Sequence, residues 1–151
     1  MQKWLRGIAL LCIALITPGE MPLTAQAPAT DAANPPAPKP RTPEQLDSLV
    51  APIALYPDPI FAQVLAASTY PLEIVEAARW LKANSNLKGE ALTKAAAKQE
   101  WDPSVQALVA FPEVLKRLDE GLQWTTDLGN AFLEQQSDVM DAAQRMRKKS
   151  S

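Results

Sequence analysis

The sequence contains no histidine and only one cysteine, Cys12. Histidine is the commonest general base and metal ligand and titrates near neutral pH, so its absence removes the usual centres of acid–base and metal chemistry. Glycine is also scarce, with 5 residues against 14 prolines, and Val, Ile and Thr are few beside Ala and Leu. This composition favours helices over hairpins and strands.

Several motif classes are missing as well. The chain has no Gly-rich phosphate loop, no cysteine or histidine cluster, and no dense acidic loop that would hold a metal through carboxylates alone. We therefore expect no metal site and no cofactor. The formal net charge is −2, and an acidic chain is a poor binder of nucleic acid, so we expect no nucleic-acid partner.

The N-terminus has the pattern of an export signal. Lys3 and Arg6 precede an apolar run over residues 7–16, which is too short to span a bilayer, and Ala25-Gln26-Ala27 supplies small residues for cleavage. We expect residues 1–27 to be a signal peptide cleaved near Ala27, and the alternative is an uncleaved anchor. Cleavage predicts a periplasmic or secreted protein with no stable transmembrane segment.

The mature chain would have no disulfide. Cys12 lies inside the signal, and the large Leu11 before it argues against lipid attachment at this cysteine. An oxidising compartment would therefore add no cross-link, and stability must come from packing. Residues 28–42 are rich in Pro and Ala without apolar periodicity, which predicts a disordered linker.

A helical domain is expected over residues 43–151. Thr42 is placed to cap the first helix, and an aromatic residue, a proline and an acid recur where later helices should start. The proline presets φ and the acid faces the positive end of the helix dipole. The prediction is an all-α, compact array of six or seven short, Pro-initiated helices with a longer C-terminal one, over about 43–51, 58–68, 71–83, 89–99, 103–110, 112–120 and 122–148.

Several idiosyncratic runs resemble one bacterial family. They include residues 51–58 (APIALYPD), 67–81 (ASTYPLEIVEAARWL), 86–89 (NLKG), 101–105 (WDPSV), 108–112 (LVAFP), 129–132 (GNAF) and 138–141 (DVMD). In this order they resemble the family called domain of unknown function 3300 (DUF3300), over about residues 46–147. The resemblance implies an exported protein of a Gram-negative bacterium and brings no activity, ligand or catalytic residue. The resemblance also implies that relatives continue past the last helix into a β-prone segment and a tail rich in Tyr, Pro and Gly. A chain that ends at Ser151 would be a short member without this tail.

The remaining candidates for catalysis are carboxylates. Glu73 shares a helical face with Trp80 and Leu81, and an acid on such a face can have a raised pKa. Alternatively, Glu73 is an acid in the first turn of a helix that stabilises the start of that helix. The same role is the simplest explanation for Asp58. Glu73 with Asp58 is the pair that an envelope hydrolase would use, provided the two carboxyl groups converge in one cleft.

The aromatic residues offer a binding surface or a set of packing anchors. Those able to line a groove for peptide or glycan are Tyr56, Tyr70, Trp80, Trp101 and Phe111. Export, missing catalytic motifs and a helical surface favour a non-enzymatic binding module of the cell envelope, with a protein or an envelope polymer as its partner. The alternatives are the carboxylate hydrolase and a structural assembly factor that associates with itself.

Overall fold

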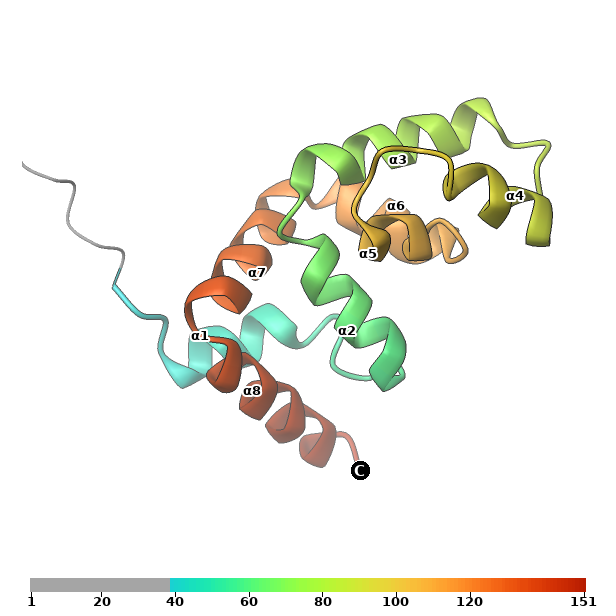
Figure 1. Ribbon diagram of the computed structural model, residues 1–151. Coiled ribbons are helices and arrows are strands. Elements are labelled where there is room, and N and C mark those ends of the chain that lie inside the picture. The colour runs from blue at the N-terminus through green and yellow to red at the C-terminus, as the bar shows by residue number, and fades with distance from the viewer. Residues whose placement is uncertain (1–38) are drawn as a thin grey trace, which may run out of the picture. The chain divides into compact units, whose positions relative to one another are not determined.

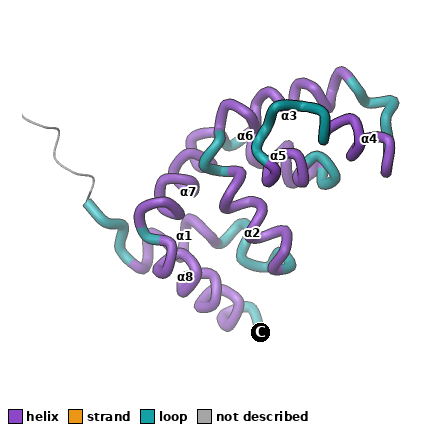
Figure 2. The backbone as a smooth tube through the Cα atoms, in the orientation of Figure 1, coloured by secondary structure: helices purple, strands orange, loops and turns teal. Residues whose placement is uncertain are grey.

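The computed structural model describes residues 39–151, and within this range every regular element is a helix (Figures 1 and 2). The all-α prediction is therefore confirmed. The predicted signal peptide and linker residues 28–38 lie outside the described residues. The helices are α1 Pro43–Val50, α2 Asp58–Ala67, α3 Pro71–Ala83, α4 Gly89–Ala96, α5 Pro103–Leu108, α6 Pro112–Glu120, α7 Leu122–Glu134 and α8 Gln136–Lys149.

Proline marks the helix starts as predicted. Five helices, α1, α2, α3, α5 and α6, have proline in one of their first two positions, where the missing N–H has no partner to lose. Thr42 caps α1 in a reciprocal box with Gln45: the Gln45 amide donates to the Thr42 hydroxyl, and the Thr42 amide donates to the Gln45 side chain. Local sequence thus determines where these helices begin.

The C-terminal part differs from the single long helix expected over 122–148. The helix breaks at Gln135, whose backbone leaves the helical region at φ −138° and ψ 47°. The Gln135 side chain accepts from the Arg41 amide at 2.7 Å and donates to the Arg41 carbonyl at 3.1 Å. Gln135 thereby joins the end of the predicted linker to the α7–α8 junction. Because of this break, the described residues form eight helices where six or seven were expected.

The core is formed between three pairs of helices. α1 packs along α8, α2 against α5, and α3 against α6, as Figure 1 shows for α1 with α8. α7 contacts α1, α2, α3, α6 and α8 and so connects these pairs. The largest fully buried side chains are Phe61, Leu46, Ile53, Leu65, Ile74, Leu108, Leu115, Leu118 and Leu128. Truncating a side chain of this kind to alanine typically costs about 2–5 kcal/mol.

A glycine permits a close approach of α7 to the backbone that follows α2. Gly129 on α7 lies against the backbone that follows α2, and a Cβ on Gly129 would meet the Ser68 carbonyl group, 2.6 Å from its carbon atom. It would also lie 3.0 Å from the Thr69 nitrogen. Both contacts are to backbone, which cannot turn away as a flexible side chain can. Only glycine therefore fits at position 129 without moving α7.

Candidate functional site

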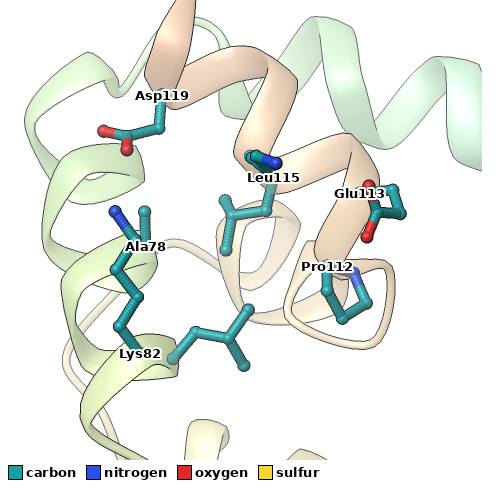
Figure 3. Close-up of a pocket in the computed structure, with 8 residues that line it drawn as sticks. Ala78, Lys82, Pro112, Glu113, Leu115 and Asp119 are labelled. Atoms are coloured by element: carbon teal, nitrogen blue, oxygen red, sulfur yellow. The ribbon is translucent and has the colours of Figure 1, made fainter. Parts of the chain in front are cut away.

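A hollow lies between α3 and α6, and we call it the α3–α6 groove (Figure 3). Its volume is about 150 Å³. An apolar cavity of that size in another protein accommodates benzene, so the groove has room for one apolar side chain rather than for a large ligand. The lining residues are Ala78, Leu81, Lys82, Pro112, Glu113, Leu115, Lys116 and Asp119.

The floor of the groove is apolar and belongs to the core. Ala78 on α3 and Leu115 on α6 are both buried, and Leu81 and Pro112 complete the apolar lining. Ala78 has only a methyl group as its side chain and lies on α3 among the residues that line the hollow (Figure 3), so it leaves space that a larger side chain would occupy. The hollow therefore depends on a small residue at a helix–helix contact.

The rim of the groove carries charges of both signs. Lys82 and Lys116 supply the cations, and Glu113 and Asp119 supply the carboxylates. Within residues 39–151, Lys116 makes only a long ion pair, 3.9 Å, with Glu120 on its own helix. An apolar floor with a mixed charged rim is the usual composition of a protein-binding surface, in which apolar contact stabilises the complex and charge selects the partner.

Glu73, the leading acid candidate, connects two helices. Its carboxylate accepts a hydrogen bond from the backbone N–H of Asp102 at 2.6 Å, just before α5. Asp102 in turn caps α5, because its carboxylate accepts from the Ser104 amide at 2.9 Å and from the Ser104 hydroxyl. Glu73 thus holds the start of α5, and it also lies in the first turn of its own helix, α3, as the simpler interpretation expected.

Electrostatics at this junction favour a charged Asp102. The hydrogen bonds from Ser104 lower the pKa of Asp102, so this carboxylate is ionised at neutral pH. The negative charge of Asp102 raises the pKa of the nearby Tyr70 phenol, which therefore stays protonated. An open depression beside Tyr70 and Glu73 also contains Leu72, Glu76 and Glu100.

Asp58 and Tyr56 lie with α8. The Arg147 guanidinium donates to the Asp58 carboxylate at 2.6 Å, to the Tyr56 carbonyl at 3.2 Å and to the Ala54 carbonyl at 2.7 Å. It also lies over the Phe61 ring, 5.4 Å from the centroid. Asp58 is therefore part of a connection between α8 and the turn before α2. No hydrogen bond or shared partner joins Asp58 to Glu73 among the residues that the structure describes.

The predicted aromatic residues do not form one surface. Trp80 and Trp101 pack edge to face at 5.7 Å between centroids, and the Trp101 indole donates to Glu76 at 3.3 Å. Both rings are half-buried against the core, whereas Tyr70 and Phe111 are exposed. Tyr70 and Glu73 lie beside Asp102 before α5, and Trp80 packs on Trp101. Tyr56, Asp58 and Phe111 take no part in these contacts.

Comparison with known proteins assigns the family. The family model described as "Protein of unknown function (DUF3300)" matches residues 42–151. The chain belongs to the DUF3300 family. The chain is 48% identical over 103 residues to the uncharacterized protein YacH of Escherichia coli strain K12. The aligned residues make up 68% of this chain and 17% of YacH. The chain therefore corresponds to a small part of that relative, and no solved structure matches it.

The groove of this DUF3300 domain was missed by reasoning from the sequence. Only the pairing of α3 with α6 shows that Ala78 and Leu115 face one another. The available signal was weak: a small residue, Ala78, on the apolar face of an amphipathic helix. Within residues 39–151, no helix is long and apolar enough to cross a membrane, and no group of three or more acidic or cysteine side chains is placed to hold a metal ion.

Proposed function

We propose that this DUF3300 domain is a non-enzymatic binding module of the cell envelope, and that the α3–α6 groove is its docking site. The partner, a protein or an envelope polymer, would place one apolar group on the floor formed by Ala78 and Leu115. The observation that carries the proposal is an open apolar hollow of about 150 Å³ with charges of both signs around it. Such a surface supplies apolar contact and a charge pattern for selection.

The carboxylates considered for catalysis already have roles in the fold. Glu73 holds the start of α5 and Asp58 binds Arg147 on α8. No buried polar side-chain atom among the described residues lacks a hydrogen-bond partner. These assignments support binding over hydrolysis, because a working acid–base pair needs two carboxyl groups directed at one substrate.

The envelope location is part of the proposal and depends on the N-terminal pattern. The basic residues, the short apolar run and Ala25-Gln26-Ala27 support export and cleavage near Ala27. Mass spectrometry of the N-terminus of the exported protein tests this part. A mature N-terminus close to Pro28 is expected, and an intact Met1 on the exported protein would contradict it.

Photo-crosslinking in the native host tests the docking site. A photoreactive amino acid replaces Lys82 on the groove rim, and in a matched strain it replaces Lys94, an exposed lysine on α4 outside the groove. We expect a discrete adduct from position 82 and none from position 94. The second variant, Ala78→Leu, fills the groove and should abolish the adduct. An adduct that forms equally in Ala78→Leu, or only from position 94, would contradict the proposal.

A further inference from the structure

The most exposed large apolar side chain of the described residues is Leu72, with 77% of its surface accessible. It stands in the first turn of α3 on a stripe of exposed residues that continues through Glu76 and Arg79. A single exposed leucine is ordinary on a protein surface. Leu72 is distinguished by its fixed position on a helix and by the two charges of opposite sign that follow it.

The two other highly exposed leucines lack this setting. Leu133 on α7 is 70% accessible and Leu55, in the turn before α2, is 69% accessible. α7 contains no lysine or arginine, and residues 51–57 around Leu55 contain no charged side chain. Leu72 is therefore the one of these three leucines that has an acid and a base beside it on its own helix.

The groove complements Leu72 in size and in charge. Its volume of about 150 Å³ suits one apolar side chain, and its floor is formed by buried Ala78 and Leu115. The rim lysines, Lys82 and Lys116, can face Glu76, while the rim acids can face Arg79. Opposite charges that meet around an apolar contact set the orientation of a complex more than its strength.

Leu72 cannot reach the groove of its own chain. At 3.6 residues per turn, the groove residues Ala78, Leu81 and Lys82 on the same helix point away from Leu72 by about 120°, 180° and 80° around the helix axis. They are also separated along the axis by up to about 15 Å. A leucine and a groove that face different directions can meet only between molecules.

We infer that Leu72 of one copy of this chain docks into the α3–α6 groove of a second copy. The inference depends on the proposed function, because it names the occupant of the same groove. The surface that donates differs from the surface that accepts, so every copy offers one leucine and one groove for contact with another copy.

Disulfide trapping between two variants tests the contact. The full chain carries Cys12→Ser, so that the only thiol in each variant is the introduced one. Leu72→Cys is mixed with Lys82→Cys under mild oxidation, and the control mixes Leu133→Cys with Lys82→Cys. The expected result is a mixed disulfide that forms several-fold faster in the first mixture. Equal rates in the two mixtures would overturn the inference.

Light scattering on the exported protein provides the second measurement. One apolar side chain makes a weak interface, so the apparent mass is followed up to about 1 mM protein. We expect the mass to rise with concentration in the wild type and in Leu133→Gln, and to stay monomeric in Leu72→Gln. A wild type that remains monomeric, or a Leu72→Gln variant that associates like the wild type, would overturn the inference.

The two proposals fail separately. If Leu72 does not pair with the groove but the Lys82 probe still gives an adduct that Ala78→Leu abolishes, the groove binds another molecule. Self-association is then wrong, and the proposed function stands. If both the trapping and the Lys82 adduct are absent, the groove is not a docking site and both proposals fall.

Discussion

Replacing Gly129 with alanine should destabilise the domain. A Cβ at this position would lie 2.6 Å from the carbonyl carbon of Ser68, and the neighbouring atoms are backbone. Forcing an extra methyl group into a packed interior costs about 1–3 kcal/mol, and a clash with backbone belongs at the upper end. Glycine in a helix is less favourable than alanine by about 0.5–1 kcal/mol, so the substitution recovers part of the loss.

The expected net loss for Gly129→Ala is about 2 kcal/mol in the free energy of unfolding. With a typical urea slope of about 1–3 kcal/mol/M, the midpoint should fall by about 1 M, as followed by circular dichroism. The matched control is Asn130→Ala, which changes the next residue on the exposed side of α7 and should shift stability by less than about 0.5 kcal/mol. A Gly129→Ala midpoint equal to that of Asn130→Ala would show that the backbone at Ser68 leaves room for a Cβ at position 129.

Three further predictions concern polar contacts. Arg147→Ala should cost about 2 kcal/mol in urea unfolding, because it removes hydrogen bonds to two carbonyls and to Asp58, and Arg147→Lys should recover only part since lysine lacks the forked donors. Glu73→Ala should cost about 1–2 kcal/mol by leaving the Asp102 N–H without this acceptor, whereas Glu73→Gln should cost less because its amide oxygen still accepts; equal losses would contradict this assignment. Arg145 and Lys149 lower the pKa of Asp47. The contribution of these contacts to folding stability is therefore present above about pH 4 and is lost as the pH falls through the lowered pKa. Asp47→Asn should show a smaller drop in urea midpoint from pH 7 to pH 3 than the wild type.

Helix starts were predictable because their causes are local. Thr42 lies three residues before the Gln45 that completes its capping box, and each proline presets the backbone at its own position. The break at Gln135 was not predictable for the opposite reason. Its side chain binds the backbone of Arg41, 94 positions away in the sequence, and α7 and α8 otherwise continue one helical pattern.

The same distinction applies to the candidate site. The sequence placed Glu73 beside aromatic residues, but it could not show that the Asp102 amide, 29 positions later, would take up its carboxylate. Predicting the groove also requires the pairing of helices, since Ala78 becomes the floor of a hollow only when α6 packs against α3. Patterns along one helix predict which face is buried, and the pairing of helices decides where that face is left incompletely covered.

The most direct test of the account is whether the α3–α6 groove accepts a leucine side chain. The methyl resonances of Leu81 and Leu115, which line the groove, are followed by nuclear magnetic resonance while N-acetyl-leucine amide is added at millimolar concentration. We expect both residues to shift with this probe, N-acetyl-glycine amide to leave them unchanged, and Ala78→Leu to abolish the response. Shifts that are absent, or equal for the two probes, or unchanged in Ala78→Leu, would contradict it.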